Sequence, residues 1–173
     1  MGLWQRLTGR KGENAAAALY QAVVAHGRRP EWYEEGAVPD TVNGRFDMIA
    51  SVLAIVLLRM EAEPAAAAAS AQLAECFIED MDGQLRQIGI GDVVVGKRMG
   101  KMMGLVGGRL GAFREALAQP DGTAFEDALL RNLYRAEHPG DSALTFSATR
   151  LRDLYAQLAA VPLDALLAGK LSA

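Results

Sequence analysis

The sequence predicts an all-α protein: a single compact domain of about six to eight helices, with a long ordered loop near residues 28–43. Three observations lead to this class. Apolar residues recur at helical spacing through most of the chain, whereas the alternation typical of strands is scarce. Hydrophobic residues make up 51% of the 173 residues and charged residues 23%, a composition that supports one buried core. Capping residues, glycines and prolines then divide the chain into segments of helix length.

The chain is expected to consist of a tail, residues 1–13, and a helical domain, residues 14–173. The tail has no apolar stretch of the kind that a secretory signal contains. Its Leu3, Trp4 and Leu7 stand beside basic residues and fit an interfacial membrane anchor. A disordered or docked tail fits equally well, so both interpretations stay open.

The first helix is expected between Asn14, which can cap it, and Gly27, which ends it. His26 in its last turn is interpreted as a cation that complements the negative end of the helix. The loop that follows contains prolines and glycines and has no periodicity. Trp32 and Tyr33 are the residues expected to pin this loop to the domain.

The next segment, residues 46–58, is predicted to be the most buried helix. It is apolar nearly all round over eleven consecutive residues, and Asp47 and Arg59 close that stretch at its two ends. Eleven residues are too few to cross a bilayer, so the helix belongs to the core. Another helix is expected from Pro64, with apolar residues along one side and charged residues along another.

The following helix carries a stripe of glycine. Asp92 can cap it, and six glycines lie between residues 96 and 111. Each glycine costs a helix interior about 1 kcal/mol relative to alanine, so propensity alone does not favour a helix here. The stripe nevertheless has helical spacing, because Gly96, Gly100, Gly104 and Gly108 recur every fourth residue.

Three interpretations of this glycine stripe remain open. The glycines can let another helix of the same domain approach closely. They can keep the segment adjustable, so that the methionines among them form a soft surface for apolar partners. Alternatively, Lys97, Arg98 and Lys101 can engage phosphates of lipid or RNA. The three are compatible, because one helix has several faces.

The last part of the chain is also helical by pattern. Thr123 and Glu126 form a capping box that starts a helix. A final pair of helices is expected around residues 151–158 and 163–167.

Charge is unevenly distributed along the chain. The formal net charge of −3 argues against a dedicated nucleic-acid binder. Residues 31–82 carry a balance of −9, whereas residues 83–119 carry a balance of +4. Either the molecule has an acidic side and a basic side, or the two segments face each other.

Residues suited to catalysis or metal binding are few. The carboxylates of residues 79–82 can hold magnesium, but only one such cluster is present, and a solvated face or an ion-pair network explains it better. His26 and His138 are the only histidines, and no nucleophile–base pair is evident. The segment from Gly91 resembles a phosphate-binding loop, but Arg98 stands where Ser or Thr must bind the metal. We therefore expect no catalytic residue, metal or cofactor.

Two blocks, "WYEEGAVPDTVNGRFDM" at residues 32–48 and "FIEDMDGQLRQIGIGDVVVGKRMGKM" at residues 77–102, resemble the ubiquinol–cytochrome c chaperone family. The resemblance covers roughly residues 15–160. It implies an all-helical, non-enzymatic chaperone that binds newly made cytochrome b during assembly of ubiquinol–cytochrome c reductase, respiratory complex III. In mitochondria such proteins work with a small partner subunit and near the ribosome. The short leader favours a bacterial member, peripheral at the cytoplasmic face of the inner membrane.

The resemblance and the stripe together define the expected site within a chaperone domain at residues 14–173. The residues expected to bind the client are Gly96, Lys97, Arg98, Met99, Gly100, Lys101, Met102, Met103 and Gly104. Those expected to support this motif are Trp32, Tyr33, Asp80, Asp82, Arg86 and Asp92. Two alternatives stay open: a peripheral membrane enzyme with magnesium at the Glu79–Asp82 cluster, and a structural interaction subunit. Nucleic acid is not expected as the primary ligand.

Overall fold

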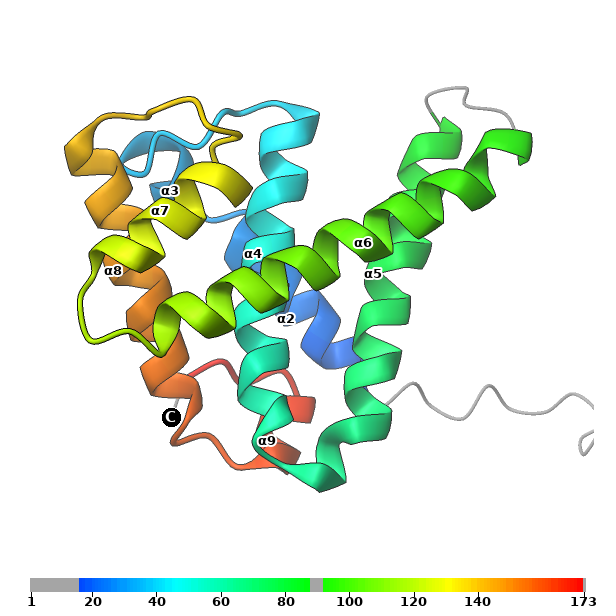
Figure 1. The fold of residues 1–173 in the computed structure, drawn as a ribbon. Helices are drawn as coiled ribbons and strands as arrows, with labels where there is room; N and C mark the ends of the chain where they lie inside the picture. Colours follow the sequence, from blue (N-terminus) through cyan, green and yellow to red (C-terminus); the bar gives the residue numbers. More distant parts are fainter. Residues whose placement is uncertain (1–15, 88–91, 173) are drawn as a thin grey trace, which may run out of the picture.

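The computed structural model describes residues 16–87 and 92–172, and these residues form helices joined by short connections, without a strand (Figure 1). Eight α-helices and one 3-10 helix are described, which confirms the predicted class and number. Their bounds are α2 Ala17–Gly27, α3 Glu31–Glu34, α4 Val42–Glu61, η1 Pro64–Ala66, α5 Ala67–Gln87, α6 Asp92–Leu117, α7 Thr123–Asn132, α8 Asp141–Leu158 and α9 Leu163–Leu167. The possible membrane anchor at Leu3, Trp4 and Leu7 lies outside the described residues. None of the described helices is long and apolar enough to cross a membrane.

Helix α4 forms the centre of the molecule, as predicted for residues 46–58. It begins four residues before the start of the predicted helix, because the Thr41 hydroxyl accepts a hydrogen bond from the Gly44 amide at 3.1 Å and caps the helix. Helices α2, α5, α6 and α8 pack around it. A helix that is apolar nearly all round is stable only when neighbours cover every face, and α4 has such neighbours.

The expected loop after α2 contains one helical turn, α3, and is fixed by its two aromatic residues. The Trp32 indole donates to the His26 carbonyl at 2.8 Å, and the Tyr33 hydroxyl donates to the Gly27 carbonyl at 2.8 Å. Trp32 is fully buried, and its ring lies 6.2 Å from that of Phe146 in α8. The predicted pinning role of both aromatic residues is therefore confirmed.

The prediction of a charge on His26 is wrong. The pKa of His26 is lowered to about 4, mainly by burial and also by the nearby Arg29 guanidinium. The imidazole is consequently neutral near pH 7. The helix-end effect on a histidine is smaller than the cost of burying its charged form here.

Helix α6 is long and lies across the body of the protein. It packs against α4, α5 and α7, and its N-terminal part projects beyond the body beside the end of α5 (Figure 1). Met102, Val106, Arg109 and Phe113 form its buried side. Their spacing of four, three and four residues places them on one face, so the glycines lie on another.

The acidic and basic segments of the chain face each other. Arg109 in α6 pairs with Asp47 in α4 at 2.9 Å, and Arg114 in α6 pairs with Glu61 at 2.7 Å. Both pairs join residues 83–119 to residues 31–82. The second of the two arrangements considered for the charges is therefore the one observed.

Candidate functional site

The glycine stripe of α6 is open. A Cβ atom placed on Gly100, Gly104, Gly107 or Gly108 would meet nothing within 4 Å. By contrast, a Cβ on Gly27 would lie 3.0 Å from the backbone of Ile49, where α2 and α4 approach closely. Close packing inside the domain is therefore the role of Gly27 and not of the described glycines of α6.

Large apolar side chains stand beside these glycines. Met103 is 48% exposed and Leu105 is 46% exposed, and both belong to the few large hydrophobic residues at the described surface. We define the outer face of α6 as the exposed residues Lys97, Gly100, Lys101, Met103, Gly104, Leu105, Gly107 and Gly108. Met102 is buried on the opposite side. The surroundings of Gly96, Arg98 and Met99 lie outside the described part of the chain.

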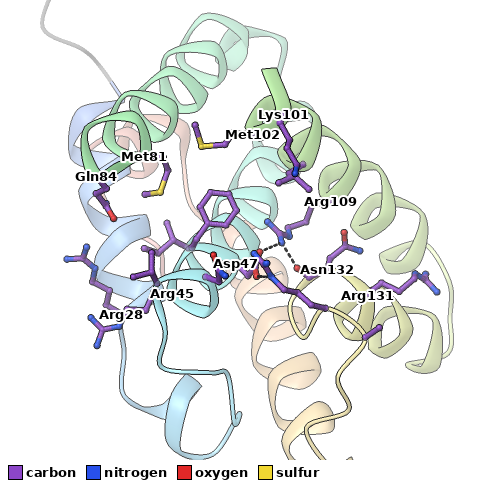
Figure 2. A pocket seen from close by; sticks show the side chains of 17 residues that line it. Arg28, Arg45, Asp47, Met81, Gln84, Lys101, Met102, Arg109, Arg131 and Asn132 are labelled. Atoms are coloured by element: carbon purple, nitrogen blue, oxygen red, sulfur yellow. Dashed lines mark hydrogen bonds and ion pairs between the residues drawn. The ribbon is translucent and has the colours of Figure 1, made fainter. Parts of the chain in front are cut away.

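A groove of about 990 Å³ lies next to this face (Figure 2). Its walls come from the start of α4, the end of α5, the middle of α6 and the connection that follows α7. The apolar residues that line it are Val42, Phe46, Ile49, Met81, Met102, Leu105 and Ala136. The cationic residues that line it are Arg28, Arg45, Lys101, Arg109, Arg131 and Arg135.

One carboxylate, that of Asp47, organises the middle of the groove. Asp47 is 4% exposed, and its two oxygens accept hydrogen bonds from different helical regions. Arg109 Nη2 donates to Oδ1 at 2.9 Å, and Arg135 Nε donates to Oδ2 at 2.6 Å. Figure 2 shows Arg109 between Asp47 and Asn132, whose carbonyl it also contacts. The three charged side chains thus join α4, α6 and the connection that follows α7.

The guanidinium of Arg109 is incompletely satisfied. Its Nε and Nη1 are buried and have no hydrogen-bond partner among the described residues. Burial lowers the pKa of Arg109, whereas the Asp47 carboxylate acts in the opposite direction. Because Asp47 also neutralises Arg135, the group of three retains a net positive charge.

The carboxylates of the acidic cluster predicted at residues 79–82 do not line the groove. Asp80 accepts a hydrogen bond from the Tyr20 hydroxyl at 2.6 Å and another from the Gln84 amide at 3.2 Å, so it joins α5 to α2. No three His, Cys, Asp or Glu side chains are grouped to hold a metal ion in the part of the chain that the structure describes. Asp82 belongs to the same helix, and the side chains of Arg86 and Asp92 lie outside the described residues.

The groove itself was not predicted from the sequence. Of its cationic residues only Lys101 was expected in a binding site, and Asp47 was interpreted as the boundary of an apolar segment. A signal was present: Arg109 and Asp47 each occupy a position where the helical period requires an apolar residue. Two opposite charges at core positions indicate a buried ion pair. The two residues are 62 positions apart in the chain, so spacing alone cannot show that they pair with each other.

The described residues form a small helical protein in which an exposed helix face lies beside a basic groove. The comparison with family models then identifies it. Residues 34–173 match the family described as ubiquinol-cytochrome C chaperone, and the chain belongs to this family. It is therefore an assembly chaperone of the complex III class, as the resemblance implied.

A solved structure supports the same assignment. The chain is similar to the crystal structure of the Cbp3 homolog from Brucella abortus, with 32% sequence identity and a TM-score of 0.80. The match covers 98% of this chain and 96% of that chain. A comparison with curated proteins gave no match.

Proposed function

We propose that the protein is a non-enzymatic chaperone that binds newly made cytochrome b during assembly of ubiquinol–cytochrome c reductase. The outer face of α6 is the proposed contact. Family membership supports the assembly role. The observation that carries the contact is the open space over Gly100, Gly104, Gly107 and Gly108, beside the exposed Met103 and Leu105.

The chemistry of this face suits a client made of apolar helices. A row of glycines lets the backbone of a second helix approach closely, which increases van der Waals contact where the hydrophobic effect between membrane helices is weak. Methionine is flexible and polarizable, so Met103 can adapt to client side chains of different shape. Lys97 and Lys101 are exposed on the same face, and their long side chains can keep the charged ends in water while the stems contact the client.

The proposed location follows from the proposed client. A protein that meets newly inserted cytochrome b works at the cytoplasmic face of the bacterial inner membrane. A small partner subunit or the ribosome is a further proposed contact there. A chaperone should co-purify with precursors of complex III, whereas a structural subunit should co-purify with the mature complex.

The test separates stability from function. We would change Gly104 to Leu and Met103 to Asp, each in the full chain, and complement a deletion strain with each variant. A side chain added at Gly104 would point into open space, and Met103 is half exposed. The purified variants should therefore melt close to the unchanged protein. Gly104→Leu should be slightly more stable, because leucine is the better helix former. Membranes from both strains should lack the haem spectrum of cytochrome b.

Gly83 in α5 supplies a matched control. A Cβ on Gly83 also meets nothing within 4 Å, but Gly83 is not on the outer face of α6. Gly83→Leu should therefore melt normally and support normal assembly. If Gly104→Leu and Met103→Asp both assemble complex III normally while folded, the client does not bind this face.

A further inference from the structure

The groove concentrates positive charge in a protein that is acidic overall. Six cationic residues line it together with one carboxylate, that of Asp47, which leaves an excess of five positive charges. Counting Asp40, which pairs with Arg45 at 2.6 Å, reduces the excess to four. The whole chain has a formal charge of −3. A concave site with apolar walls focuses the field of its charges, so this groove attracts anions.

Two further features add to that attraction. The buried Arg109 has two nitrogens without a partner among the described residues, and its charge is only partly neutralised. An anion in the groove would offset the cost of burying this charge. The first turn of α4, at Val42 and Asn43, also lines the groove, and the N-terminal end of a helix carries partial positive charge.

The groove combines apolar residues with cationic residues that lie around them. Met81 comes from α5 and Met102 from α6, and Figure 2 shows the two sulfur atoms on the same side of the groove. Arg28 and Arg45 come from the end of α2 and the start of α4, and Arg131 from the end of α7. A ligand that satisfies both kinds of residue has an anionic head and an apolar chain. Guanidinium groups are particularly suited to phosphate, which they bind through paired hydrogen bonds.

We propose that this groove binds one anionic phospholipid of the membrane. The phosphate lies among the arginines that line the groove, and an acyl chain lies along the apolar residues Phe46, Ile49, Met81 and Met102. Val42 at the rim is 71% exposed and reaches the bilayer interface. The volume of about 990 Å³ falls at the upper end of the range of roughly 300–1,000 Å³ that is usual for small-molecule sites. This inference does not depend on cytochrome b being the client.

The chain's own tail does not fit the groove by charge. Arg6, Arg10 and Lys11 outnumber Glu13 there, so the groove repels residues 1–13. A lipid also accounts for the apolar residues, which free phosphate would leave uncovered. An acidic peptide is the competing ligand that the experiment must distinguish.

The experiment is flotation of the purified full chain with lipid vesicles. The protein should float with vesicles of phosphatidylcholine and phosphatidylglycerol, should not float with phosphatidylcholine alone, and should dissociate as salt is raised. Lys101 and Arg131 are both exposed, so the double variant with Lys101→Gln and Arg131→Gln should fold normally. Each lost charge should weaken binding about fivefold, so the double variant should bind about 25-fold more weakly.

Matched controls separate lipid binding in the groove from general attraction of the protein surface to anionic vesicles. Arg150→Gln removes an exposed charge from α8, outside the groove, where it pairs with Glu31, and should leave flotation unchanged. Gly104→Leu should also float normally, so loss of the client contact and loss of the lipid site are distinguishable. Val42→Asp should reduce flotation, because a carboxylate at the rim repels the anionic surface.

Competition identifies the ligand. Short-chain phosphatidylglycerol should raise the melting temperature of the unchanged protein and not that of the double variant, whereas inorganic phosphate should raise neither. Equal stabilisation by inorganic phosphate would mean a simple anion site, and displacement of vesicles by polyglutamate but not by short-chain lipid would mean a peptide site. Either result, or flotation unaffected in the double variant, overturns the proposal.

Discussion

Asp47 is the residue on which the arrangement of the groove most depends. It is nearly fully buried, and it binds one arginine from α6 and another from the chain after α7. A buried ion pair contributes little net stability compared with apolar residues of the same size. Removing one partner of the pair nevertheless lowers the stability of the protein, because the other charge then remains buried without a counter-charge.

We predict that Asp47→Asn lowers the free energy of unfolding by about 3–5 kcal/mol. The amide keeps the shape of the side chain but leaves Arg109, which is 3% exposed, without its counter-charge. Urea unfolding of the purified variant measures the change. Asp40→Asn is the control, since the Asp40–Arg45 pair is exposed and its loss should not move the unfolding midpoint. Equal midpoints for the two variants would show that Arg109 does not need Asp47.

Among the helices, α6 has two unlike faces. Its buried face holds Met102, Val106 and Phe113 against the core, which fixes the helix in spite of its glycines. Tertiary packing supplies most of the stability of helices in proteins, so low propensity on the outer face is tolerated. The glycines of that face thus lower the stability of the helix, and the fold does not require them.

We predict that Gly107→Ala raises the free energy of unfolding by about 1 kcal/mol. The added methyl group meets nothing within 4 Å, and alanine loses less backbone entropy on folding. Gly44→Ala is the opposite case, because its Cβ would lie 1.9 Å from the Pro39 carbonyl oxygen and must displace the backbone there. Thermal melting of both variants measures the contrast, and a destabilised Gly107→Ala protein would mean that something covers this face.

In the molecule as a whole, the N-terminal helices are joined to the C-terminal half around Trp32. Its ring lies 5.9 Å from that of His26 in α2 and near Phe146 in α8, and Glu31 pairs with Arg150 at 2.8 Å. The Tyr134 hydroxyl adds a further link by donating to the Gly36 carbonyl at 2.6 Å. Because the His26 ring lies against Trp32, a charge on His26 should weaken the contact between the two halves.

We predict that acidification destabilises the protein through His26. Its pKa is about 4 in the folded protein and about 6.5 in the unfolded chain, so the unfolded chain binds the proton more readily. The contribution of neutral His26 is fully present above pH 6.5 and is lost as the pH falls towards 4, at up to about 1.4 kcal/mol per pH unit. Unfolding at several pH values should show a shallower slope in His26→Gln than in the unchanged protein, with His138→Gln as the exposed control. Identical slopes for all three would contradict the assignment.

Much of the scaffold could be predicted from sequence because helix formation is encoded in local patterns. Local patterns predicted the buried helix at residues 46–58 and the pinning by Trp32 and Tyr33, and two sequence blocks indicated the family. The charge on His26 could not be predicted. A local rule puts a cation at a helix end, but burial in the folded protein decides whether the imidazole is charged.

From its sequence alone the chain could be recognised as all-α, as carrying glycines on one face of α6, and as similar to complex III chaperones. The packing of the helices was needed to show that this face is open and that six cationic residues from several elements line one groove. The difference lies in the distance over which each kind of information acts. Periodicity fixes which side chains of a helix lie together, because they are three or four residues apart. Which neighbour covers a face, and which charges 62 residues apart become partners, depends on how all the helices pack around α4.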